Sequence, residues 1–172
     1  KLTRAAGIVT TSSSGAVGIG TTIITGISTV GIAVSDLVDN TNFIAGTKVS
    51  AIGIGTVYAD RASTNEAAAS AQIFRFLGMT TAYTSAAATK SILIGGTFAN
   101  NTESQVNLTV EIHDASAGIQ AALASKVPVP NGSSFVISDA GKTILEATDE
   151  VRVFCDAANA IDVNLSILTG VS

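Results

Sequence analysis

Two glycine-rich stretches are the first candidates for chemistry in this sequence. The stretch "FIAGTKVSAIGIGTVY" at residues 43–58 contains Gly53 and Gly55, and a Gly-x-Gly turn can bring the backbone close to a pyrophosphate. Such a site needs a third glycine and a following helix, whereas here residues 56–58 lead into a β-branched run. We therefore interpret Gly53-Ile54-Gly55 as a corner between two strands, and the similar run at residues 18–22 in the same way.

A second phosphate-site candidate is the run Gly141-Lys142-Thr143, which resembles the end of a P-loop. The P-loop motif requires a glycine five residues before Gly141, but Val136 stands there within a strand-like run. We predict an ordinary turn around Ala140-Gly141 instead.

The residues that could act in catalysis or metal binding are few. His113 is the only histidine and Asp114 follows it, but no Gly-x-Ser-x-Gly elbow accompanies them, so we expect a histidine at a surface or strand edge. A zinc site would need His113 to meet Cys155 and carboxylates without any characteristic spacing. Cys155 continues the inward alternation of Val151 and Val153, which indicates a small core residue.

Acidic residues occur at Asp149-Glu150, Asp156 and Asp162 without the spacing of a calcium-binding loop, so we expect solvated loop carboxylates. We predict no catalytic, cofactor-binding or metal-binding residues, no cofactor, and no enzymatic activity.

Composition narrows the classes of partner. Charged residues make up 13% of the 172 residues, about half the usual share, and aromatic residues 5%. The net charge of −4 and nine scattered basic residues argue against nucleic-acid binding. The mean hydropathy is +0.48, yet no apolar run approaches the roughly 18 residues of a membrane-spanning helix. We expect no membrane association and a surface covered by copies of the chain or by a partner.

The apolar pattern predicts antiparallel strands with one buried face. Residues alternate between apolar and polar in "VNLTVEI" at 106–112 and in "IDVNLSI" at 161–167. Short β-branched runs, "SILIGGTF", "SSFVIS", "KTILEA" and "EVRVFC", have the spacing of a sandwich or jelly roll. The predicted core consists of alternating residues of these runs: Val106, Leu108, Val110, Val151, Val153, Ile161, Val163 and Leu165.

The N-terminal part is also β-rich but has more glycine. Between the two parts, Ser63 and Glu66 have the spacing of a helix capping box before an alanine run. A short helix over residues 63–71 and an extended linker both fit this pattern. We predict an all-β fold with a glycine-rich β module at residues 1–75 and a jelly-roll-like antiparallel β-sandwich at 76–172. Because residue 1 is Lys rather than Met, we expect a processed chain or a piece of a longer polypeptide.

Two segments resemble known structural modules. Residues 36–64 are similar to a β module of bacteriophage tail, fibre and virion proteins, through a Gly-Thr-x-Val corner at Gly46–Val49, a strand start at Gly55–Val57 and the pair Ala62-Ser63. The C-terminal part resembles the end of β-sandwich proteins of tailed phages, especially marine and cyanobacterial ones. The motifs there are the turn "PNGSS" at 130–134, the corner Leu145–Asp149 and the final strand "DVNLSIL".

These resemblances imply a virion structural protein without catalytic residues. The function we expect is an exterior capsid decoration or cement protein, trimeric, bound to the major capsid protein or to tail proteins. The alternative is a tail-fibre or appendage subunit that binds a receptor or glycan. Against the alternative, sugar sites usually present aromatic faces, and this chain has no Trp and two tyrosines, Tyr58 and Tyr83.

Overall fold

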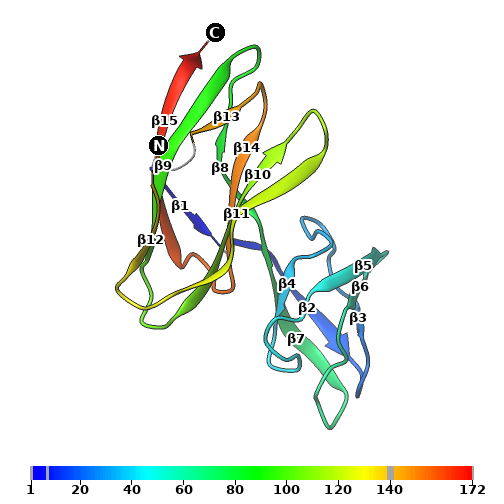
Figure 1. The fold of residues 1–172 in the computed structure, drawn as a ribbon. Coiled ribbons are helices and arrows are strands. Elements are labelled where there is room, and N and C mark those ends of the chain that lie inside the picture. The colour runs from blue at the N-terminus through cyan, green and yellow to red at the C-terminus, as the bar shows by residue number, and fades with distance from the viewer. Residues whose placement is uncertain (1, 7, 139–141, 172) are drawn as a thin grey trace. The chain divides into compact units, whose positions relative to one another are not determined.

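The computed structural model describes residues 2–6, 8–138 and 142–171 (Figure 1). All regular elements in these ranges are strands, which confirms the predicted all-β class. The chain divides into two compact units. We call residues 1–8 and 79–172 the jelly-roll unit and residues 9–78 the inserted unit, because the second interrupts the first in the sequence.

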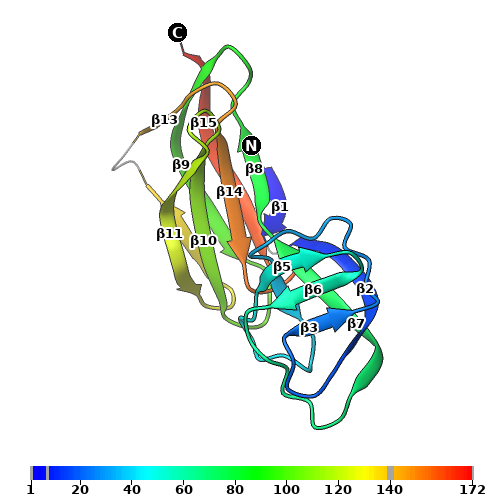
Figure 2. The ribbon, with the colours of Figure 1, turned by 90° about the vertical axis from the view of Figure 1, so that its right-hand side faces the viewer.

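The jelly-roll unit is a sandwich of two antiparallel sheets (Figures 1 and 2). One sheet has the order β1-β15-β9-β12, with β13 also paired to β9, and the other has the order β11-β10-β14-β8. The strands are β1 Leu2–Ala6, β8 Thr80–Thr84, β9 Lys90–Asn100, β10 Val106–Asp114, β11 Ile119–Val129, β12 Ser134–Ile137, β13 Thr143–Leu145, β14 Glu150–Cys155 and β15 Ile161–Val171.

The order in which the chain visits the two sheets gives the unit its jelly-roll topology. Strands β8, β9 and β10 alternate between the sheets, β10 and β11 form a hairpin within one sheet, and the chain then crosses to β12 and β13, back to β14 and finally to β15. Eight strand positions in two four-stranded layers, wound in this way, are those of a jelly roll. The topology agrees with the predicted fold class.

The sandwich core contains all eight predicted residues, from Val106 to Leu165. The predicted alternation is confirmed, because Leu108 and Val110 are fully buried whereas Asn107, next to Leu108 on the same strand, is exposed. Phe98 adds the largest side chain, at 0% exposure. The pairing of Leu108 with Cys155 and of Val110 with Val153 keeps apolar side chains of β10 and β14 on the same inner face.

The inserted unit has its own sheet, in the order β4-β7-β2-β3-β6-β5, and its own core. Its strands are β2 Ile8–Val17, β3 Ile23–Thr25, β4 Leu37–Asp39, β5 Val49–Gly53, β6 Thr56–Ala59 and β7 Ala69–Gly78. Phe74 and Phe76 are fully buried, and the Phe74 ring meets Phe43 edge to face at 6.4 Å between centroids. A unit of this size can therefore bury its own apolar cluster.

The helix alternative for residues 63–71 is wrong. Ser63 is buried and does not cap a helix: its Oγ donates to the Gly18 carbonyl at 2.9 Å and accepts from the Thr21 amide at 3.1 Å. The alanine run enters β7, where it continues into residues that pair with β4. These long-range contacts override the capping-box pattern, which reports only local propensity.

The contact-defined units differ from the expected division at residues 75 and 76. The inserted unit ends at Gly78, and residues 1–8 belong to the jelly-roll unit because β1 pairs with β15, with Thr3 opposite Val163. The turn predicted at Ala140-Gly141 lies outside the described residues.

Candidate functional site

The Gly-x-Gly stretches form strand corners, as predicted. Gly53 ends β5, Gly55 adopts a φ of 63° and β6 begins at Thr56, so the turn closes a two-residue hairpin without a helix. Ile54 at its tip is fully exposed. Gly20, with a φ of 58°, has the equivalent place between β2 and β3. The positive φ explains the glycine at each corner.

His113 and Asp114 are the last two residues of β10. His113 lies at the end of β10, half-buried, with Glu150 and Gln120 as cross-strand neighbours. Asp114 Oδ1 accepts hydrogen bonds from the amide and hydroxyl of Ser116, at 2.9 and 2.7 Å. The Ser116 hydroxyl, with further backbone bonds and the nearby His113, lowers the pKa of Asp114. The carboxylate therefore stabilises the β10–β11 turn.

Cys155 is a core residue, as predicted. It is fully buried on β14 within the sandwich core, and burial raises the pKa of its thiol. A buried thiol with a raised pKa has little thiolate character, so the arrangement is unsuited to nucleophilic chemistry.

The carboxylates named in the sequence are held by separate partners. Asp156 accepts from the Asn107 amide and side chain, Glu150 pairs with Arg152 at 2.6 Å, and Asp162 accepts from Asn101. In the described part of the chain, no group of three or more His, Cys, Asp or Glu side chains could hold a metal ion.

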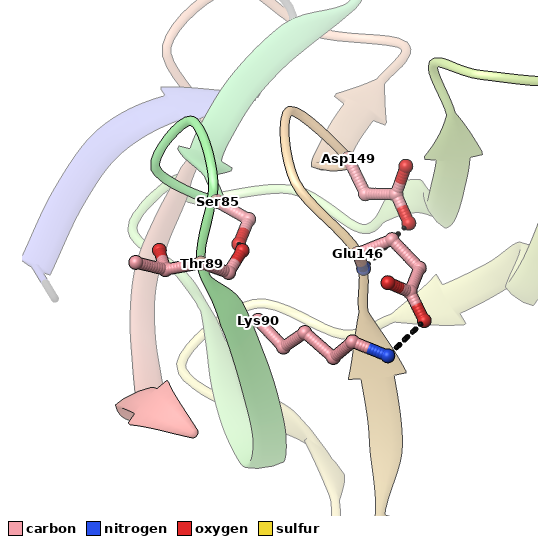
Figure 3. Close-up of polar contacts among 5 residues, drawn as sticks. All are labelled: Ser85, Thr89, Lys90, Glu146 and Asp149. Atoms are coloured by element: carbon pink, nitrogen blue, oxygen red, sulfur yellow. Dashed lines mark hydrogen bonds and ion pairs between the residues drawn. The ribbon is translucent and has the colours of Figure 1, made fainter. Parts of the chain in front are cut away.

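The expectation of a solvated loop carboxylate is wrong for Asp149, because the corner Leu145–Asp149 is built around this buried aspartate (Figure 3). Asp149 is 4% exposed, and its Oδ2 accepts from the Glu146 amide at 2.9 Å while its Oδ1 accepts from the Ala115 amide at 3.1 Å. The Ser85 amide donates to the Asp149 carbonyl, and Lys90 pairs with Glu146 at 3.0 Å. Asp149 therefore connects three loops at one end of the sandwich by hydrogen bonds, which gives the corner Leu145–Asp149 a structural role.

The "PNGSS" turn is anchored by Asn100, whose structural role was not predicted from the sequence. Asn100 is 5% exposed, and the two hydrogens of its Nδ2 are shared among the carbonyls of Ser104, Val129 and Pro130, at 2.7, 3.0 and 3.1 Å. Its Oδ1 accepts from the amide and hydroxyl of Thr102. No local pattern marks this role, because two of its partners lie about 30 positions along the chain.

A shallow hollow of about 560 Å³ lies on the outer face of the β15-β9-β12 sheet. Gly95 and Gly96 form part of its wall, with the polar residues Thr97, Asn164 and Ser166, the apolar residues Ile94 and Val136, and Lys142. Its size falls within the usual range of small-ligand pockets. None of its lining residues is aromatic or acidic, so the hollow offers a ligand hydroxyl, amide and ammonium groups beside the apolar side chains of Ile94 and Val136.

The described surface carries sixteen large hydrophobic side chains outside both cores. In the inserted unit they include Ile19, Val30 and Ile54 at turns and loops; in the jelly-roll unit they include Ile144 and Leu168 on strands. Burying a half-exposed Ile or Leu contributes about 1 kcal/mol, taken as half the value of a fully exposed side chain. These side chains are distributed over both units, and each adds to the exposed apolar area of its own unit.

Comparison with protein-family models finds no match, and searches of curated proteins and of solved structures find none either. No helix long and apolar enough to cross a membrane occurs in the residues that the structure describes.

Proposed function

We propose that this chain is a structural protein of a tailed-bacteriophage particle, an exterior capsid decoration or cement protein that acts by protein–protein assembly. It self-associates, as a trimer by analogy with the proteins it resembles, and attaches to the major capsid protein or to a tail protein. Neither nucleic acid, membrane nor catalysis has a part in this role.

The observation that carries the proposal is the exposed apolar surface on two β units. Sixteen large hydrophobic side chains are exposed although each unit already has a filled core. Apolar area of this kind is stabilised by burial against other copies or a lattice. The polar residues with unusual environments, Asp149 and Asn100, are engaged in holding loops, which leaves assembly as the function that the geometry supports best.

The test is co-sedimentation of the purified full chain with capsids and, separately, with tails from tailed phages of marine cyanobacteria. We expect saturable binding to one of the two particles, with a fixed number of copies, and a sedimentation coefficient of an oligomer at micromolar concentration. A chain that is monomeric and binds neither particle would contradict the proposal. The acidic protein bovine serum albumin serves as the control for non-specific pelleting.

A second candidate is a receptor-binding subunit of a tail fibre or appendage. The hollow beside Gly95 favours it, because Thr97, Asn164 and Ser166 could donate to or accept from sugar hydroxyls. A glycan array separates the two functions. Binding to defined glycans that is lost in Asn164→Leu, with particle attachment through tails, would favour the receptor-binding subunit over the decoration protein.

A further inference from the structure

The two outer faces of the jelly-roll unit differ in charge. On the β10-β14 face, Glu111 is paired with Arg152 and His113 with Glu150 across the strands, and Arg152 Nε lies 2.6 Å from Glu150 Oε2. These side chains alternate with Val110, Val151 and Val153, which are in the core. At these positions the face is polar and ionic, as expected of a sheet surface in contact with water, although the half-buried Phe154, opposite Thr109, lies on the same face.

The opposite outer face carries an apolar row. Leu168 on β15 is directly paired with Ile92 on β9, and Ile92 with Ile144 on β13. The residues next to them on each strand, Leu93, Leu145 and Ile167, pack into the core. The side chains of Leu168, Ile92 and Ile144 therefore point outward. Leu168 is 52% exposed and Ile144 60%. Cross-strand neighbours of this kind form a continuous band across three strands.

The apolar band extends into the next positions of the same face. Ile94 on β9 and Val136 on β12 are exposed beside it. The outward positions that follow along β15, Ser166 and Asn164, are uncharged. We call the outward side chains Leu168, Ile92, Ile144, Ile94 and Val136 the apolar band.

Charge at the border of the apolar band is low. Lys90, at the start of β9, and Glu146, directly after β13, neutralise each other at 3.0 Å. Lys142 is exposed immediately before β13. An apolar centre with a few charged groups at its border is the usual anatomy of a protein–protein interface.

The face is also of a suitable size. β15 and β9 have eleven residues each, about 36 Å at about 3.3 Å per residue, and three strand widths of about 4.8 Å give roughly 500 Å² of flat area. Side-chain relief increases the accessible area above this value. A standard interface buries about 800 Å² on each partner. The apolar band occupies part of this face, whose third strand position is held by the short strands β12 and β13, so the remainder of the interface would come from the polar residues around the band.

We propose that the apolar band is the self-association interface of the chain, where it packs against the same band of other copies around the symmetry axis. The inference rests on the self-association in the proposed function and specifies its surface. Identical faces that meet must not repel each other. The apolar band meets this condition, whereas the β10-β14 face would bring Glu111 and Glu150 of several copies together.

Residues on a symmetry axis approach their own counterparts, so a single introduced cysteine tests the inference. The native Cys155 is fully buried and should not react. We expect Ile144→Cys to form a disulfide-linked dimer band under mild oxidation. Ala122→Cys is the control, because Ala122 is exposed on β11 opposite Glu111, on the other sheet's outer face. Equal cross-linking of both variants, or of the control alone, would overturn the inference.

A charged substitution provides an independent readout. Ile144→Lys and Leu168→Lys should each weaken self-association at least tenfold in sedimentation velocity, whereas Ala122→Lys should leave it unchanged; circular dichroism confirms that each variant is folded. Unchanged self-association of both band variants would overturn the inference. It would also be overturned if the band variants lost particle binding but still self-associated, because the apolar band would then be the surface that contacts the particle. Particle binding by the unmodified chain is measured separately, and its absence would contradict the proposed function alone.

Discussion

Replacing Asn100 by Asp should destabilise the jelly-roll unit strongly, although the two side chains have nearly the same shape. Asn100 Nδ2 points at three carbonyl oxygens, those of Ser104, Val129 and Pro130. Asn100→Asp puts a second oxygen in place of this donor. The carbonyls then lose their shared partner and face a carboxyl oxygen at hydrogen-bond distance.

The magnitude follows from the number of groups left unpaired. A buried polar group without a partner costs about 1–3 kcal/mol. The Val129 carbonyl contact is buried, whereas the contacts to Ser104 and Pro130 are part-buried, so water can compensate them in part. We expect a loss of about 3–5 kcal/mol in the free energy of unfolding at pH 7, a large share of the roughly 5–15 kcal/mol typical of a domain.

The loss should depend on pH with a defined sign. The carbonyl oxygens disfavour the charged carboxylate, so the pKa of the carboxyl group introduced by Asn100→Asp should lie, in the folded variant, above its unfolded value of about 3.9. The protonated acid can donate one hydrogen bond, and its stabilising contribution is fully present below the unfolded pKa. It is lost as the pH rises through the folded pKa. The difference in the free energy of unfolding between Asn100→Asp and the unmodified chain should therefore increase from pH 3 to pH 7.

Urea unfolding followed by circular dichroism at several pH values measures both effects. Asn131→Asp is the matched control, because Asn131 is exposed in the turn that Asn100 anchors; its effect should stay within about 0.5 kcal/mol. The reasoning would be refuted if Asn100→Asp cost less than about 1 kcal/mol at pH 7, or if its cost were larger at pH 3 than at pH 7.

Three further changes test the core, a close backbone contact and a turn. Leu108→Ala removes a fully buried side chain and should cost about 2–5 kcal/mol in urea unfolding, whereas Asn107→Ala, on the exposed face, should cost far less; equal losses would mean that the faces are reversed. Gly95→Ala would place a Cβ 2.7 Å from the Ile137 carbonyl oxygen and should cost about 1–3 kcal/mol, and an unchanged melting temperature would contradict this contact. Because hydrogen bonds lower the pKa of Asp114, its carboxylate stabilises the fold above the unfolded pKa of about 4, and this contribution is lost as the pH falls. Asp114→Asn should therefore lose less stability than the unmodified chain upon acidification. An equal loss of stability in both chains would argue against this role.

The sandwich could be predicted because its central strands have one buried face each. In β10 from Val106 to Ile112 and in β15 from Ile161 to Ile167, every second residue enters the core, so the period-two pattern indicated both that these segments are strands and which face is buried. The polar anchors could not be predicted in this way. Asn100 and Asp149 act through backbone groups brought together by the topology, and a pattern of side-chain types contains no information about which carbonyl or amide will be adjacent.

Local sequence patterns also could not predict that β1 belongs to the jelly-roll unit and that the inserted unit follows it. β1 pairs with β15, at the other end of the chain, whereas consecutive strands are usually neighbours. Without β1, the eleven-residue β15 would be an edge strand with unpaired backbone groups, a site for uncontrolled pairing with other chains. Placing residues 9–78 in the connection between β1 and β8 leaves the strand pairs of both sandwich sheets intact, because the insertion lengthens only a segment between strands. The outward side chains of β15, β9 and β13 therefore keep their cross-strand order whatever the length of the insertion, and they form the surface that we assign to self-association.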